Sequence, residues 1–175
     1  MSACATKDDS KSDRDAVDTD TAKTPGYTAL GDSATAADSL AAEADAKARM
    51  AKLIEQFPSQ YLIDDSFETH DSAYLGINGL NDVLTAQYVI DGIQVVLFVT
   101  EDRSGAKYLL LTEFATTQSQ VRPAPMPFDA GYSVLFNHLR AGRVLSGLKA
   151  GYLVGMVGYR DSMAEFTDRW ISAIG

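Results

Sequence analysis

The segment DDSFETHD, residues 64–71, holds the densest group of side chains that could bind a metal ion. Carboxylate oxygens suit Ca²⁺ or Mg²⁺, whereas an imidazole favours a transition metal. The candidate ligands are Asp64, Asp65, Glu68, His70 and Asp71. Their spacing matches neither an EF-hand loop nor the HExxH helix. We therefore expect a solvated acidic loop or edge strand here, with a metal site as the alternative, and we predict no cofactor.

His138 is one of only two histidines and the other candidate for acid–base chemistry. It lies in LFNHLR, on a predicted strand, where it alternates with apolar neighbours. A histidine on the polar face of the strand is the simpler interpretation, and a general base acting with Asn137 or Arg140 is the alternative. No G-x-S-x-G elbow is present, and the single cysteine is residue 4. We therefore expect no catalytic residue.

Glycine, proline and aromatic residues give weaker indications of binding. The strand glycines do not form G-x-G-x-x-G, so we expect them to permit close packing against the covering helices, with a concave ligand surface as the alternative. These are Gly142, Gly147, Gly151, Gly155 and Gly158. The segment PAPMP, 123–127, is read as a linker, although it could present a polyproline II face to a partner. Trp170 and Phe166 are expected on the core face of a helix rather than in an exposed patch.

The elements that must position these residues begin with a helix. Residues 35–38, TAAD, have the spacing of a capping box. Apolar residues then recur at helical spacing, at Ala46, Met50, Leu53 and Phe57. Pro58 predicts the end of the helix, because the residue before a proline is pushed out of the α region.

Strands and two further helices are predicted after Pro58. Apolar runs predict strands at 61–63, 73–77, 83–90, 93–100, 132–139, 143–149 and 152–159. Asp91-Gly92 predicts a tight hairpin turn, because both residues tolerate positive φ. Residues 104–116 are predicted as a helix capped by Ser104, with the return strand of a hairpin as the alternative. Ser162 and Glu165 have capping-box spacing and predict the start of a last helix.

These elements predict an α+β domain over residues 34–175. We expect an antiparallel sheet of about six strands, covered on one face by two or three helices. The second half of the domain also aligns with the first, since Val83-Leu84-Thr85 matches Val144-Leu145-Ser146 and a glycine-containing turn follows in both. We interpret this as a β-β-α pseudo-repeat, about 60–117 and 130–175, joined by a proline-rich loop at 121–129.

Composition restricts the class of partner. Of the 175 residues, 46% are hydrophobic, which supports a real core. The 24 acidic and 15 basic residues give a formal net charge of −9. Nucleic acid is not an expected partner, because non-specific binding depends on Lys and Arg neutralising phosphates. The sequence contains no run of about 18 apolar residues, so we predict no membrane-spanning helix in it.

Residues 1–33 differ from the rest in composition. They are built mainly from Asp, Lys, Ser, Thr and Ala without an apolar period. Such a segment cannot bury enough surface to offset the entropy of ordering, so we expect a disordered tether. Between Cys4 and Ser33 a flexible chain would span roughly 30 Å r.m.s..

The start of this tether, Ser2-Ala3-Cys4, resembles the last three positions of the bacterial lipobox, and the polar stretch after it is similar to the tethers of bacterial lipoproteins. The charged and hydrophobic signal segments of that family are missing, and Met1 stands where a Leu-like residue would be. The resemblance implies that Cys4 is lipidated and that a signal peptide has been replaced. Ala5, in place of the Asp that favours inner-membrane retention, implies an outer-membrane anchor facing the periplasm.

Our first hypothesis is therefore a non-enzymatic envelope lipoprotein, anchored to a membrane through Cys4, whose domain binds a protein partner or a small ligand. A small hydrolase or metal-dependent enzyme using His138 or the 64–71 segment is the second hypothesis. The third is a cytosolic oligomeric protein with a structural role. The sequence does not identify the ligand, the partner or the oligomeric state.

Overall fold

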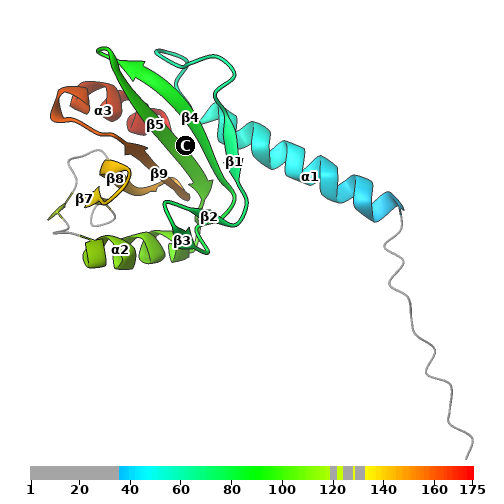
Figure 1. The fold of residues 1–175 in the computed structure, drawn as a ribbon. Helices are drawn as coiled ribbons and strands as arrows, with labels where there is room; N and C mark the ends of the chain where they lie inside the picture. Colours follow the sequence, from blue (N-terminus) through cyan, green and yellow to red (C-terminus); the bar gives the residue numbers. More distant parts are fainter. Residues whose placement is uncertain (1–35, 119–121, 124–127, 129–132) are drawn as a thin grey trace, which may run out of the picture. The chain divides into compact units, whose positions relative to one another are not determined.

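The computed structural model describes residues 36–118, 122–123, 128 and 133–175 (Figure 1). The predicted tether, Cys4 and most of the proline-rich loop lie outside these residues. The described part contains the helices α1 (Ala36–Glu55), α2 (Ala106–Gln118) and α3 (Ala164–Ala173), with a single 3₁₀ turn, η1 (Asp161–Met163), directly before α3.

An antiparallel sheet forms the centre of the domain. Within the described residues it has seven strands in the order β1-β4-β5-β9-β8-β7-β6. The strands are β1 (Glu68–His70), β4 (Val83–Ile90), β5 (Ile93–Glu101), β6 (Arg122–Pro123), β7 (Ser133–His138), β8 (Gly142–Lys149) and β9 (Tyr152–Val157). The predicted α+β class with an antiparallel sheet is confirmed. The two outermost strands, β1 and β6, are the shortest of the sheet.

Two tight turns of the same kind set the register of the sheet. Asp91 and Gly92 have φ of 52° and 75°, which confirms the predicted hairpin between β4 and β5. Ala150 and Gly151 have φ of 51° and 82° and join β8 to β9 in the same way. The two hairpins then meet through β5 and β9, which pair antiparallel at the centre of the sheet.

The sheet is covered on both faces, whereas the sequence led us to expect cover on one. Val95, Leu97 and Val99 of β5 belong to a core that also contains residues of α3 and the end of α1. Phe98 points to the opposite face and packs in a second core with Leu111 and other residues of α2. Figure 1 shows α2 and α3 on opposite sides of the strands. Consecutive apolar residues in β5 require this arrangement, because successive side chains of a strand alternate between faces.

Gly155 lies where the two hairpins meet. It is the register partner of Phe98 on β5, and a Cβ atom at this position would overlap both the Phe98 ring and the carbonyl oxygen of Leu145. Gly155 therefore permits close packing, against a neighbouring strand rather than against a helix. Gly142, Gly151 and Gly158 have positive φ.

The order β-β-α occurs twice, as β4-β5-α2 and β8-β9-α3. The helices that follow the two hairpins pack on opposite faces, so the correspondence is limited to the strands. β9 ends at Val157, before Gly158 at a φ of 86°, whereas β5 continues to Glu101. An internal duplication stays a prediction.

Two of the predicted strands take other forms. Residues 73–77 contribute instead to a separate small hairpin, β2 (Ala73–Tyr74) and β3 (Ile77–Asn78), because Leu75 and Gly76 between them adopt φ of 52° and 72°. Residues 61–63 bond to the edge of β4 through two backbone hydrogen bonds, from Val89 to Tyr61 and from Ile63 to Gln87, without forming a strand.

The helix predicted over 104–116 is confirmed as α2, but its principal cap is Asp102. The buried Asp102 carboxylate, 5% exposed, accepts the backbone N–H of Tyr108 at 2.8 Å, and Ser104 accepts that of Ala106 at 3.3 Å. The capping box predicted at Ser162 is wrong, because neither η1 nor α3 has a side-chain cap. The 3₁₀ turn instead places the N–H of Met163 2.9 Å from the carbonyl oxygen of Arg160.

The difference between Asp102 and Ser162 predicts unequal effects of two similar substitutions on stability. Asp102→Ala should lower the free energy of unfolding by about 1–2 kcal/mol, because it removes the side-chain acceptor of an N-terminal amide of α2. Ser162→Ala should change it by less than about 0.5 kcal/mol, since Ser162 caps nothing. Urea denaturation followed by circular dichroism measures both values, and equal losses would contradict the assignment.

Candidate functional site

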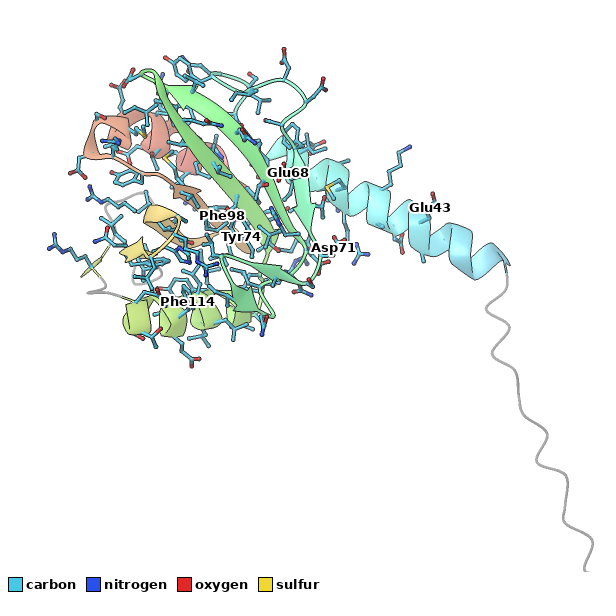
Figure 2. All side chains as sticks on the ribbon, in the orientation of Figure 1. Glu43, Glu68, Asp71, Tyr74, Phe98 and Phe114 are labelled. Atoms are coloured by element: carbon cyan, nitrogen blue, oxygen red, sulfur yellow. The ribbon has the colours of Figure 1, made fainter. Side chains whose placement is uncertain are left out.

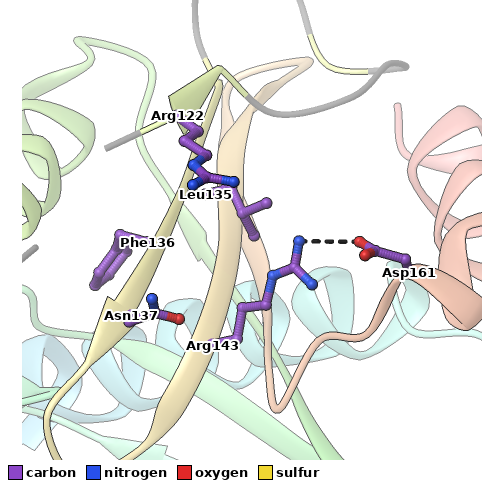
Figure 3. Close-up of a pocket in the computed structure, with 6 residues that line it drawn as sticks. All are labelled: Arg122, Leu135, Phe136, Asn137, Arg143 and Asp161. Carbon is purple, nitrogen blue, oxygen red and sulfur yellow. Dashed lines mark ion pairs between the residues drawn. The ribbon is translucent and has the colours of Figure 1, made fainter. Parts of the chain in front are cut away.

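A cavity of about 540 Å³ opens over strands β7 and β8. The described residues that line it are Arg122, Leu135, Phe136, Asn137, Arg143 and Asp161 (Figure 3). Leu135 belongs to the core shared with α3, and Asn137 lies two residues further along the same strand face. Arg143 is the register partner of Asn137 and so shares this face. The cavity therefore lies on the α3 side of the sheet, towards its β6 edge.

Arg143 is held from three directions. Its backbone carbonyl accepts hydrogen bonds from the N–H groups of Gly158 and Tyr159, at 2.9 and 3.1 Å. Its guanidinium carbon lies 5.3 Å from the centroid of the Tyr159 ring, a cation–π distance. Its Nη2 atom lies 2.9 Å from Oδ1 of Asp161, the ion pair drawn in Figure 3. Tyr159 and Asp161 thus position the guanidinium, and the backbone bonds fix the strand end from which it extends.

The Arg143–Asp161 pair remains in contact with water. The Arg143 side chain is 35% exposed and that of Asp161 is 81% exposed. Ion pairs of this kind contribute only about 0.2–1 kcal/mol to stability, because water screens the attraction and the side chains lose entropy. Asp161 can therefore leave Arg143 at a small cost in free energy.

The pKa of the Tyr159 phenol depends on burial and on the charged groups beside the ring. Burial raises the pKa of its phenol, and the nearby carboxylate of Asp161 raises it further, while the Arg143 guanidinium lowers it and Asp168 raises it. The phenol therefore stays neutral above its ordinary titration range, so its ring continues to support the guanidinium as an uncharged aromatic face.

Arg122 contributes a second guanidinium to the cavity. It lies on the short strand β6, where its register partner is Leu135 of β7. The described lining thus carries two arginines and one aspartate in a chain whose net charge is −9. Guanidinium groups bind carboxylates and phosphates through pairs of parallel hydrogen bonds. With Leu135 as an apolar contact, the cavity can hold an oxyanion attached to an apolar body.

Sequence reasoning missed this site. Arg122 lies in the segment predicted as the proline-rich loop, Arg143 is the second residue of β8, and Asp161 is the first residue of η1, so no local motif joins them. The pairing of β6 with β7 and of β7 with β8 brings the two arginines to one face.

The candidate metal ligands lie along the opposite edge of the sheet. Glu68 and His70 belong to β1, which pairs with β4, while Asp64 and Asp65 precede this strand and Asp71 follows it. Figure 2 shows Glu68 and Asp71 at separate points along this edge. Among the described residues, no group of three or more His, Cys, Asp and Glu side chains is arranged to hold a metal ion.

His70 takes part in packing. Its Nε2 atom lies 3.3 Å from Oγ1 of Thr85, and its ring centroid lies 4.8 Å from that of Tyr74. Tyr74 in turn packs against Phe98 in the core beneath α2. Burial, with a smaller contribution from Glu68, raises the pKa of Tyr74, so this phenol is not a source of protons near neutral pH.

His138 joins three parts of the fold. Its Nδ1 atom accepts the backbone N–H groups of Arg140 and Ala141 at 3.2 and 2.9 Å, so Nε2 carries the proton and donates it to the carbonyl oxygen of Leu75 at 3.1 Å. Its ring stacks on Phe114 of α2 at 5.5 Å. Both ring nitrogens therefore hold the β7–β8 turn against the β2–β3 hairpin. Asn137 precedes His138 in β7 and therefore lies on the other face of the strand.

Trp170 and Phe166 are buried, 3% and 7% exposed, as the helical pattern predicted. The indole Nε1 of Trp170 donates to the carbonyl oxygen of Gln56 at 2.7 Å and ties α3 to the segment after α1.

A second hollow, of about 500 Å³, lies beside Lys107 in the first turn of α2. The Nζ atom of Lys107 donates to Oγ1 of Thr100 at 2.6 Å and to the carbonyl oxygen of Asn81 at 2.7 Å. Burial lowers the pKa of Lys107, and the carboxylates of Asp82, Asp102 and Glu101 oppose that shift. These bonds give the ammonium a structural role, since they join α2 to β5 and to the chain before β4.

Comparison of the chain with protein-family models, with curated proteins and with solved structures gave no match. None of the helices in the described ranges is sufficiently long and apolar to cross a membrane. Function is accordingly inferred from the chemistry of the cavity and from the N-terminal sequence.

Asp161→Asn should lower the pKa of Tyr159, because the substitution removes an anion that raises it and leaves Arg143 in place. The free energy of unfolding should fall by less than about 1 kcal/mol. Alkaline titration of the Tyr159 ring by NMR measures the shift, with Asp65→Asn, at the opposite edge of the sheet, as the control. An unchanged or higher pKa in Asp161→Asn would show that the carboxylate does not act on this ring.

Proposed function

We propose that the chain is a non-enzymatic lipoprotein of the bacterial envelope, whose folded domain binds a small ligand in the cavity over β7 and β8. The observation that carries the binding role is the guanidinium of Arg143, fixed by Asp161, Tyr159 and its own backbone at the wall of this cavity. A volume of about 540 Å³ also suits a small organic molecule.

The lining favours binding over catalysis. Its described members are two arginines, an asparagine, an aspartate already paired with Arg143, and the apolar residues Leu135 and Phe136. This set provides a few polar groups that fix orientation and an apolar surface that contributes affinity, as in ligand-binding pockets. Within it, no nucleophile lies beside a general base.

The proposed anchor is a lipid on Cys4, supported by the resemblance of Ser2-Ala3-Cys4 to a lipobox. Acyl chains contribute about 0.8 kcal/mol for each buried CH₂ group, so they can hold the protein at a membrane without help from its surface charge. Such help is not expected from a chain with a net charge of −9 facing anionic lipids. The proposed address is the periplasmic face of the outer membrane.

A protein partner is the second candidate. Leu139, in the turn between β7 and β8, is 82% exposed, and Leu109 of α2 is 60% exposed. Each of these exposed apolar side chains is available for contact with another protein.

The binding role is tested by NMR with the full-length protein and a library of small organic molecules. Ligands should shift the backbone amide signals of Leu135, Asn137 and Arg143. Asn137→Trp should abolish these shifts by filling the cavity, whereas Val89→Trp, at an exposed position of β4, should keep them. If no compound shifts the cavity signals, or if Asn137→Trp binds as well as the unmodified protein, the proposal fails.

The anchor is tested by expressing the native gene, together with any coding sequence upstream of Ser2, and fractionating the cells. Cys4→Ala should move the protein from the membrane fraction to the soluble periplasmic fraction, because the lipid attachment site is lost. The matched control combines Cys4→Ala with Ser10→Cys, which restores a thiol at the wrong position and should remain soluble. If the native protein is soluble and its Cys4 is unmodified, the lipoprotein proposal is rejected.

A further inference from the structure

Arg143 already holds a carboxylate, and that carboxylate belongs to the protein. The Oδ1 atom of Asp161 lies 2.9 Å from Nη2 of Arg143, although 81% of the Asp161 side chain is exposed. The two partners are therefore unequal. Arg143 is fixed by Tyr159 and by two backbone hydrogen bonds, whereas Asp161 is a solvated side chain from the 3₁₀ turn η1.

We infer that the ligand of this cavity carries a carboxylate, which replaces Asp161 on the guanidinium of Arg143. This inference rests on the proposed binding function and specifies the chemistry of its ligand. The apolar part of the ligand lies against Leu135, and Arg122 provides a second positive charge on the same cavity wall. Asp161 acts as an internal competitor that occupies the anion position while the cavity is empty of ligand.

The charge of the described lining favours a ligand of negative charge. When Asp161 swings into water, two guanidinium groups face the cavity, and a cationic ligand would be repelled. A neutral ligand would leave the guanidinium of Arg143 without an ionic partner if it displaced Asp161. An anion alone restores the pair, and a charge-assisted hydrogen bond is about twice as strong as a neutral one.

A carboxylate is favoured over a phosphate. The resident group on Arg143 is itself a carboxylate, so the guanidinium is open to this planar anion in the folded chain. The apolar side chain of Leu135 beside the guanidinium suits a singly charged amphiphile, whereas a phosphate carries more charge and needs more donors to replace its water.

The test uses the full-length protein and five variants in NMR titrations. The probes are hexanoate, its neutral isostere hexanamide, and hexyl phosphate. Hexanoate should shift the cavity signals with an affinity about tenfold or more above that of hexanamide. Arg143→Gln should lower the affinity for hexanoate about tenfold, Arg122→Gln should lower it less, and added salt should weaken binding.

Asp161→Asn should increase hexanoate affinity a few-fold, because it removes the competing carboxylate. Arg103→Gln, near the β8–β9 turn, should change nothing.

Several results would overturn the inference. Equal binding of hexanoate and hexanamide would show that charge is not recognised, and tighter binding of hexyl phosphate would reject the preference for a carboxylate. Unchanged affinity in Arg143→Gln, or no gain in Asp161→Asn, would reject the exchange on Arg143. Because Arg143→Gln also removes the cation–π contact, Arg143→Lys keeps the charge and should retain part of the affinity. If neutral or cationic compounds from the library bind in the cavity and hexanoate does not, the binding function stands and this inference fails.

Discussion

The pairing of β5 with β9 is the interaction on which the rest of the domain depends, because it is the only ladder that joins the two hairpins within the described sheet. It requires close packing at its centre, where the ring of Phe98 fills the space that a side chain at Gly155 would occupy. Both strands are apolar on both faces, so the pairing also requires cover on two sides. The end of α1 and α3 supply it on one side, and α2 with the β2–β3 hairpin supplies it on the other.

The candidate site lies where the apolar core on the α3 side of the sheet ends. The core on the α3 side continues along β8 and β7 as far as Leu145 and Leu135. Beyond them the same face carries the polar pair Asn137 and Arg143, which are register partners at the end of both strands. Arg143 is fixed here because β9 has already ended, and the two amides that follow it bind the Arg143 carbonyl. The geometry that closes the strand thus fixes the backbone from which the guanidinium extends, and Tyr159 and Asp161 place the guanidinium itself.

Local patterns predicted the elements better than their arrangement. Asp91-Gly92 specified a turn, and the spacing of Phe166 and Trp170 specified a buried helix face, since each signal lies within a few residues. The helix caps were predicted less well from the sequence. Ser162 has the spacing of a capping box, but it lies in a 3₁₀ turn and caps no amide. Asp102 caps α2 although it lies two residues before the predicted cap, Ser104. The faces to which α2 and α3 pack are seen only in contacts between residues far apart in the sequence. The cavity requires three strands and the 3₁₀ turn η1, which share no sequence motif, so only the folded chain assembles Arg122, Arg143 and Asp161.

α1 is a 20-residue helix that is supported unevenly along its length. Leu53 is buried and Met50 packs against the core, but residues 41–49 are all exposed. The last turns of α1 are therefore held by the core and act as the nucleus of the helix. The earlier turns are stabilised only by the small free-energy gain per residue of helix propagation, and this gain falls as temperature rises. Amide hydrogens should consequently exchange progressively faster from Leu53 back towards Ala41. The N-terminal limit of the folded domain is then a thermal equilibrium, so the length of chain available before the domain increases on warming.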